Sequence, residues 1–186
     1  MLDAYTLHPE AYTSSAEERG ALPLSWWESR LAEDERPAEL VLGAFHAGQL
    51  AGVAGLSFEA RQKVRHKATL FGVYVRSESR HLGLGRQLVG AALAHAGARP
   101  GVWLVQLTVT QGNDAARRLY ERHGFAEFGL EPFAATVGGG FVAKIHMWCP
   151  LRPGDGDLSR ICAAAPHAAA GMRRTAREMS HPDRAK

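Results

Sequence analysis

Cysteine is scarce in this sequence, and long apolar runs are missing. The 186 residues include two cysteines, Cys149 and Cys162, which are too few for the disulfide framework of a small secreted domain. No apolar run approaches the length of a membrane-spanning helix, and the N-terminus has no basic region followed by an apolar stretch. These absences predict a cytoplasmic protein without a membrane partner.

Metal-binding patterns are absent as well. His46, His66 and His81 do not have the spacing of metal ligands, and the sequence contains no His-Glu-x-x-His pattern. Hydrophobic residues make up 46% of the chain and charged residues 22%, as in an ordinary globular domain. We therefore predict a globular protein that binds no metal.

Charge is unevenly distributed along the chain. Residues 1–60 carry three basic and ten acidic side chains, whereas residues 61–151 carry twelve basic and five acidic ones. The basic region suits a phosphate-bearing ligand and the acidic region a cationic amine, because opposite potential concentrates a ligand. Solvated surface charge explains the same pattern equally well.

The last part of the chain differs in composition from the rest. Residues 152–186 contain few large apolar side chains, so burial there cannot offset the entropic cost of ordering the chain. We predict one domain over residues 1–151 and a disordered basic tail over residues 152–186. Since the excess basic charge lies in that tail, we do not expect nucleic acid as a partner.

One stretch combines a strand, a glycine turn and a helix. Thr69–Val75 is rich in β-branched and aromatic residues, which indicates a buried strand. Residues 84–95 have the apolar spacing of a helix, with Gly83 and Gly85 at its start. Glycines let the backbone approach a ligand, and free N–H groups at a helix N-terminus point at a phosphate. The stretch therefore predicts a phosphate-binding site.

The spacing of this turn decides between several phosphate-binding signatures. The dinucleotide fingerprint needs a third glycine where this chain has Leu88, and the P-loop needs Gly-Lys where it has Gly85-Arg86. The pattern that fits is Arg80-x-x-Gly83-x-Gly85. This pattern resembles the acetyl-CoA-binding signature of the GNAT N-acetyltransferase superfamily.

A second segment resembles the same superfamily. Asn113–Phe125 fits the pattern Asn-x-x-Ala-x-x-Leu-Tyr-x-x-x-Gly-Phe. The matching residues are Asn113, Ala116, Leu119, Tyr120, Gly124 and Phe125. Asn113 or Asp114 also suits a helix N-cap, and Gly124 suits the stop after a helix. Two signatures in the right order are more specific than either one alone.

The resemblance implies an α/β (α+β) fold with a mixed, mostly antiparallel central sheet flanked by helices. The residues themselves predict helices before Leu40, a hairpin around residues 46–49, a strand that ends at Pro132 and a final strand over residues 141–150. The segment 8–15 resembles the turn after the first helix in one bacterial branch of the family. Because only seven residues precede it, we expect the usual first strand to be missing.

The resemblance also implies an activity, which is transfer of the acetyl group of acetyl-CoA to a primary amine. The acceptor would be a small molecule or a protein amino group, and the family is compatible with a homodimer. The pyrophosphate would lie on Arg80, His81, Leu82, Gly83, Leu84, Gly85 and Arg86. The rest of the cofactor would lie on Val73, Tyr74, Val75, Asn113, Ala116 and Tyr120.

Catalytic roles follow from the same resemblance. Tyr120 matches the general acid that protonates the leaving thiolate. Candidates for the general base are Glu59 or His146, with His66, Glu131 and a water chain also open. In the bacterial branch that this chain resembles, an Asp-Glu pair often lies just before the core of the final strand, where this chain has Ala143-Lys144.

Alternatives to this activity stay open. A GNAT-like domain that binds acyl-CoA with little or no catalysis, as a sensor, is the main one. A nucleotide-dependent oxidoreductase is another, and Leu88 argues against it. Trp26 and Trp27 are candidates for an acceptor pocket as well as for the core.

Overall fold

The computed structural model of the protein describes residues 1–31 and 37–151. The predicted tail, residues 152–186, and Cys162 within it lie outside these residues, so the domain division there stays a prediction. Within the described part, none of the helices combines the length and the apolar character that crossing a membrane requires.

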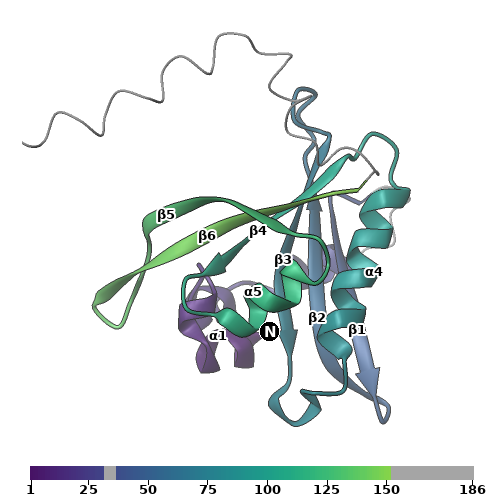
Figure 1. Cartoon of the computed structure of the whole chain (residues 1–186). Helices are drawn as coiled ribbons and strands as arrows, with labels where there is room; N and C mark the ends of the chain where they lie inside the picture. The colour runs from purple at the N-terminus through teal and green to yellow at the C-terminus, as the bar shows by residue number, and fades with distance from the viewer. Residues whose placement is uncertain (32–36, 152–186) are drawn as a thin grey trace, which may run out of the picture. The chain divides into compact units, whose positions relative to one another are not determined.

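A six-stranded sheet forms the centre of the fold (Figure 1). The strands lie in the order β1-β2-β3-β4-β6-β5, and every neighbouring pair is antiparallel except β3 and β4. Their bounds are β1 Glu39–His46, β2 Gln49–Phe58, β3 Lys67–Val75, β4 Leu104–Thr110, β5 Ala126–Val137 and β6 Gly140–Pro150. The mixed, mostly antiparallel sheet predicted from the resemblance is confirmed.

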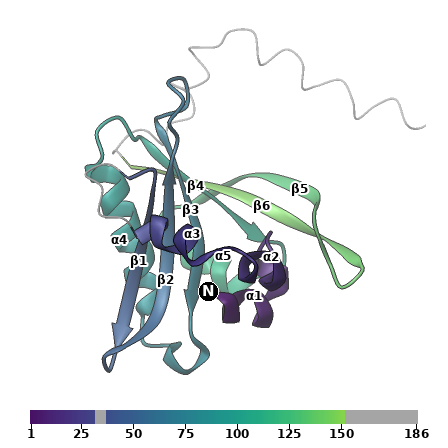
Figure 2. The same cartoon turned by 180° about the vertical axis from the view of Figure 1, so that it is seen from behind.

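Helices cover both faces of this sheet (Figures 1 and 2). On one face lie α4 (Leu84–Ala98) and α5 (Asp114–Glu121). On the other lie α1 (Leu2–Leu7), α2 (Ala16–Gly20) and α3 (Leu24–Glu28), with the short 3₁₀ turns η1 (Pro9–Ala11) and η2 (Ser29–Leu31). The described residues before β1 thus form helices and no strand, as predicted.

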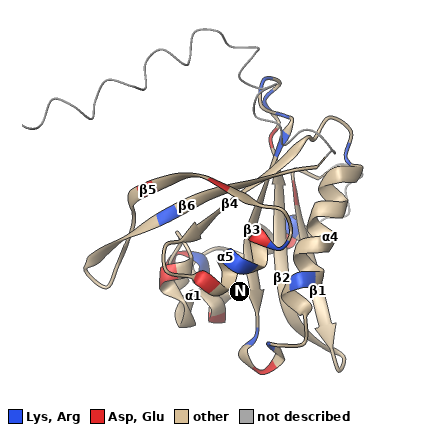
Figure 3. Ribbon diagram, viewed as in Figure 1, with Lys and Arg blue, Asp and Glu red and all other residues tan. Residues whose placement is uncertain are grey.

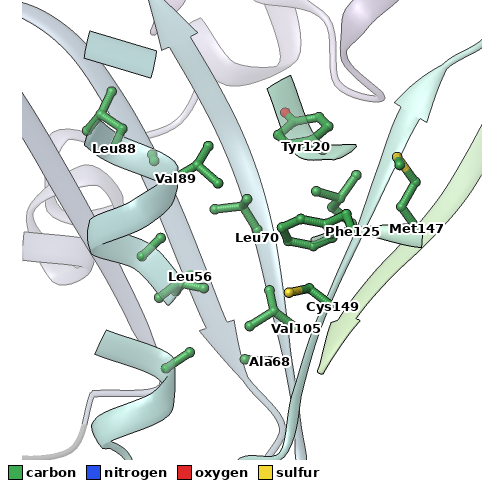
Figure 4. Close-up of a cluster of buried hydrophobic side chains, with 14 of the residues drawn as sticks. Leu56, Ala68, Leu70, Leu88, Val89, Val105, Tyr120, Phe125, Met147 and Cys149 are labelled. Carbon is green, nitrogen blue, oxygen red and sulfur yellow. The ribbon is translucent and has the colours of Figure 1, made fainter. Parts of the chain in front are cut away.

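The hydrophobic core lies between α4, α5 and the sheet (Figure 4). Leu56 of β2, Val105 of β4 and Met147 of β6 are fully buried there, together with Val89 of α4. Burying a side chain of this size contributes about 1.5–3 kcal/mol. This packing fixes α4 against the end of β3, so the turn between them has a defined position.

Strand β5 runs further than the sequence predicts. The expected end at Pro132 is wrong, because β5 continues to Val137. A proline is tolerated there since β5 is an edge strand, where one side of the backbone needs no ladder partner. The ladder shifts register between Glu131 and Ala135, and Phe133 takes a left-handed φ of 55°.

Candidate functional site

The parallel strands β3 and β4 separate along their length (Figure 1). They share three registered pairs, from Lys67 with Leu104 to Thr69 with Gln106. Beyond these pairs, the edge of β3 over residues 70–75 has no ladder partner in β4. Backbone N–H and C=O groups on such an edge can pair with an extended ligand as with an added strand.

A bulge in β3 lies at the separation. Gly55 of β2 pairs with Phe71 and Val53 pairs with Tyr74, so β3 has one residue more than β2 between these pairs. Gly72, inside the bulge, has a φ of 60°, which glycine adopts without the strain of a side chain. A bulge bends its strand and redirects its backbone groups, so it helps to open the gap.

The gap is the main part of a cleft of about 440 Å³. Both strands, the N-terminal helices, α5 and β6 contribute to its wall. Its polar and ionisable lining includes Tyr5, Tyr12, Arg19, Gln106, Thr108, Asn113, Tyr120, Lys144 and His146. Among the described residues that line it there is no aspartate or glutamate.

Tyr120 brings a phenol to this cleft from α5. Its ring packs edge-on against Phe125, with 5.8 Å between the centroids, and its hydroxyl is directed away from Phe125 (Figure 4). No other described residue forms a hydrogen bond with that hydroxyl. Burial raises the pKa of Tyr120 to about 12, so the phenol is protonated at neutral pH.

Asn113 begins α5 and also lines the cleft. Its side-chain oxygen accepts a hydrogen bond of 3.2 Å from the Ala116 N–H, so it caps the helix as predicted. The other end of α5 is fastened to α4 by His123, whose ring nitrogens lie 2.8 Å from the Leu119 carbonyl oxygen and 3.0 Å from that of Arg86. The two predicted signature helices are therefore joined directly.

Tyr12 is a second phenol in the cleft, and sequence reasoning missed it. Its hydroxyl donates a hydrogen bond of 3.4 Å to the Val73 carbonyl oxygen, next to the β3 bulge. Burial raises the pKa of Tyr12 well above its ordinary value, with neighbouring tyrosines adding to the shift and Arg80 opposing it. The one available signal was its place in the family-like segment 8–15.

The turn between β3 and α4 has the backbone of an anion site. It contains the 3₁₀ turn η3 (Ser77–Ser79), and His81 and Gly83 both adopt left-handed φ values, 68° and 77°. Gly83 is the N-cap of α4 and provides no side-chain cap for the first N–H groups of the helix. These groups and the positive end of the helix dipole therefore face outward for a ligand.

Arg80 is held at this turn by neighbouring groups. Its Nη2 lies 2.9 Å from His8 Nε2, and its Nε donates to the Val75 carbonyl oxygen at 3.4 Å. Tyr74 also lies beside His8, with 6.3 Å between the ring centroids. The turn, the end of β3 and the N-terminal segment are thus connected by residues that are not themselves part of the cleft wall.

The two candidate bases lie in different places. His146 of β6 lines the cleft, and its Nε2 lies 2.9 Å from the carboxylate of Glu131. Glu59 follows β2, is paired with Arg61 at 3.1 Å, and is not part of the cleft wall. The structure therefore brings Val73, Asn113, Ala116, Tyr120 and His146 together at the cleft wall. That wall does not include Glu59 or the predicted cofactor-binding residues Tyr74, Val75, Arg80, His81, Leu82, Gly83, Leu84, Gly85 and Arg86.

The charge of the cleft differs from the acidic acceptor region that the sequence suggested. The acids of residues 1–31 lie outside the cleft wall, whereas Lys144 and Arg19 belong to it. Lys144 is the one lysine or arginine of β6 (Gly140–Pro150), and Figure 3 colours the Lys and Arg positions of the ribbon blue and the Asp and Glu positions red. The expectation of an acidic cleft for a cationic acceptor is not met by the residues that line it.

The two tryptophans line a second, smaller cavity that shares Tyr5, Phe71 and Gly72 with the wall of the main cleft. Trp26 and Trp27 line a cavity of about 140 Å³ with Met1, Val41 and Val53 on the face of β1 and β2. Trp26 also lies against Arg19 and Arg30, whose guanidinium carbons are 4.8 and 3.8 Å from a ring centroid of Trp26. Neither tryptophan is part of the wall of the main cleft.

Comparison with known proteins gives one family. The model of the acetyltransferase (GNAT) family matches residues 1–125. A ribosomal-protein-alanine N-acetyltransferase from Brucella melitensis is 27% identical, with a TM-score of 0.64 over 80% of this chain and 91% of that one. The ribosomal-protein-S18-alanine N-acetyltransferase from Escherichia coli is 25% identical, with a TM-score of 0.61 over 84% of this chain and 92% of that one.

A third solved structure shares the fold. This is a putative acetyltransferase from Salmonella typhimurium with its cofactor acetyl-CoA. It is 20% identical, with a TM-score of 0.62 over 82% of this chain and 91% of that one.

Proposed function

Since the chain belongs to the GNAT acetyltransferase family, we propose that it transfers the acetyl group of acetyl-CoA directly to a primary amine. The observation that carries the proposal is the gap between β3 and β4. It exposes a strand edge over residues 70–75 beside the protonated phenol of Tyr120. An extended thioester and an acceptor can meet there.

The turn before α4 supplies the binding site for the pyrophosphate. The backbone N–H groups of Gly83, Leu84, Gly85 and Arg86 lie at the uncapped start of a 15-residue helix, whose dipole favours negative charge. A side chain at Gly85 would lie 3.4 Å from Leu119 Cδ2, so a glycine keeps the turn close to α5. The residues present therefore fit a diphosphate.

The exposed edge of β3 supplies the site for the arm and the thioester. Main-chain groups of Val73, Tyr74 and Val75 pair with the amides of the arm, as in strand addition. A backbone N–H of this edge polarises the thioester oxygen as negative charge develops on it. Asn113 uses its side-chain oxygen for the helix cap, which leaves the amide NH₂ for the ligand.

Tyr120 acts on the leaving sulfur. The amine nitrogen forms a bond to the acetyl carbon, the carbon–sulfur bond breaks, the nitrogen loses a proton and the sulfur gains one. A phenol with a pKa of about 12 is a weaker acid than a thiol, whose ordinary pKa is about 8.5. Tyr120 therefore offsets the charge on the departing sulfur by hydrogen bonding, and full protonation follows as the amine releases its proton.

The acceptor must lose a proton before or during the attack. His146 is the better placed of the two predicted bases, because it lines the cleft and Glu131 orients its ring through Nε2. A neutral imidazole that donates from Nε2 is basic at Nδ1. A water chain from His146 to the acceptor serves the same purpose.

A weakly catalytic acyl-CoA-binding domain is the second candidate. It is favoured by the absence of any carboxylate among the described residues of the cleft wall. Such a domain would bind acetyl-CoA at the same turn and strand edge without transferring the acetyl group. A cytoplasmic location and a homodimer stay predictions for both candidates.

One experiment separates these functions. The full chain is mixed with acetyl-CoA, CoA or NAD in a thermal-shift assay, and thiol release is then followed with a panel of amines. We expect stabilisation by both CoA species, thiol release that depends on an amine, and an acetylated nitrogen in the product by mass spectrometry. Stabilisation without thiol release from any amine would support the binding domain, and stabilisation by NAD alone would contradict both candidates.

A further inference from the structure

Lys144 is an unusual residue in the wall of this cleft. Its exposed fraction is 5%, although it is charged at neutral pH in most proteins. Burial lowers the pKa of Lys144, and the charge of Glu131 opposes this shift. A buried ammonium needs hydrogen-bond acceptors or an opposite charge to offset its lost hydration.

The described residues give Lys144 little compensation. Its Nζ donates one hydrogen bond, of 3.3 Å, to the hydroxyl of Thr13. No carboxylate of the described chain lies within ion-pair distance of Lys144. The carboxylate of the nearby Glu131 is hydrogen-bonded to His146 instead. An ammonium has three donors, so the capacity of Lys144 for an acceptor ligand is largely unused.

Arg19 is a second cation in the same wall. Its guanidinium lies over Trp26 at 4.8 Å, and its Nε is buried without a hydrogen-bond partner among the described residues. Stacking on an aromatic ring leaves the edge of a guanidinium free for an oxyanion. The wall therefore holds two cations and, within the described chain, no acid to neutralise them.

We propose that the amine acceptor also carries an oxyanion, such as a carboxylate or a phosphonate, and that Lys144 binds this oxyanion. This inference rests on the proposed acetyl transfer and defines the substrate class for it. Arg19 adds positive potential to the cleft. A polyamine or an acceptor that bears only cationic groups is excluded by the same charges.

The strand geometry limits the size of this acceptor. Lys144 and His146 are two residues apart on β6 and both line the cleft, so they lie on one face of the strand. Positions two apart on a strand are separated by about 7 Å. A molecule that reaches from an oxyanion site at Lys144 to a base at His146 has its amine a few bonds from its oxyanion, as in an amino acid.

Matched acceptors test the inference. The wild type is assayed for thiol release with free amino acids, with the same amino acids as α-carboxamides, with aminomethylphosphonate and with spermidine. We expect acetylation of acceptors with an oxyanion and a preference over the matching carboxamide of about 10- to 100-fold in kcat/KM, the range of one charge-assisted hydrogen bond.

Variants assign this preference to Lys144. Lys144→Met removes the charge at similar length and should abolish the preference by raising KM for the oxyanion acceptor, whereas Lys144→Arg should retain most of it. Lys63→Met removes an exposed lysine outside the cleft and should leave the preference unchanged. Binding of acetyl-CoA, measured by thermal shift, establishes that each variant is folded.

The outcomes distinguish the two proposals. If the wild type acetylates carboxamides or spermidine as well as free amino acids, the inference is wrong and the proposed acetyl transfer stands. The inference is also wrong if Lys144→Met lowers the rate equally for both members of each pair, as a base or a purely structural lysine would. Thiol release from none of these amines also refutes the inference, and acetylation of any other amine of the wider panel would then leave the proposed transfer standing. If Lys144→Met does not fold, the wild-type preference decides.

Discussion

Substitution of Gly83 by alanine distinguishes the cost of backbone strain from a loss of ligand affinity. This glycine is the N-cap of α4 with a φ of 77°, and a Cβ placed on it would meet no protein atom within 4 Å. Gly101, in the loop before β4, shares these properties, with a φ of 85° and open space around its Cβ. Gly83→Ala and Gly101→Ala therefore impose similar strain, and Gly83 alone lies at the proposed pyrophosphate site.

The expected fall in melting temperature and the expected loss of CoA affinity follow from this comparison. Forcing an alanine into the left-handed region costs about 1–2 kcal/mol, so both variants should unfold about 2–8 °C below the wild type. At Gly83 the added methyl group would occupy open space at the proposed pyrophosphate site, so it would displace the phosphate and weaken one or two charge-assisted hydrogen bonds. Each is worth about 1.5–3 kcal/mol, which predicts weaker CoA binding by about 10- to 100-fold or more.

Calorimetric titration of CoA into each folded variant measures this difference. Gly101→Ala should bind CoA with the wild-type dissociation constant at its lower melting temperature. The account of the turn is refuted if Gly83→Ala binds CoA as tightly as Gly101→Ala does. It is equally refuted if both variants lose affinity to the same extent, because strain would then explain the loss.

Three further predictions concern the cleft. Tyr120→Phe should lower kcat by about 10- to 100-fold with little change in KM for acetyl-CoA, and an unchanged rate at saturating amine across pH would exclude the role of the phenol. Because burial raises the pKa of Tyr120 from 10.0 to about 12, the unfolded chain ionises first, so wild-type stability falls as pH rises above 10. Urea titrations should show a smaller fall in Tyr120→Phe, by about 2–3 kcal/mol near pH 12, and parallel curves would contradict this. Gly55→Ala would place a Cβ 2.4 Å from the ring of Phe71, which lines the cleft. It should therefore lower the free energy of unfolding by about 1–3 kcal/mol and alter KM for the acceptor. Gly20→Ala, where a Cβ meets no atom within 4 Å, should be neutral in both denaturation and kinetics.

Local features of the fold were predictable from the sequence. The strand, glycine turn and helix over residues 69–95 depend on neighbouring residues, and the structure places β3 and α4 there. The cap at Asn113 follows from its own side chain and the N–H of Ala116, three residues later. These elements need no information about distant parts of the chain.

Non-local features were not predictable in the same way. The opening of the cleft depends on where two parallel strands stop pairing, and residues 69 and 106 are far apart in sequence. The burial of Lys144 depends on β6 lying against the segment of Thr13, more than a hundred residues away. The sequence predicts a strand end at Pro132 because a single residue does not reveal that β5 is an edge strand.

Residue-resolved hydrogen exchange in the presence of acetyl-CoA tests the central claim most directly. If acetyl-CoA lies in the gap between β3 and β4, the amides of residues 70–75 that do not pair with β2, and those of residues 83–86, should exchange more slowly on binding. The reason is that the ligand would occupy groups that have no partner in β4 or in the helix. NAD should cause no such change. Protection confined to other parts of the described chain, with both segments unchanged, would contradict the account.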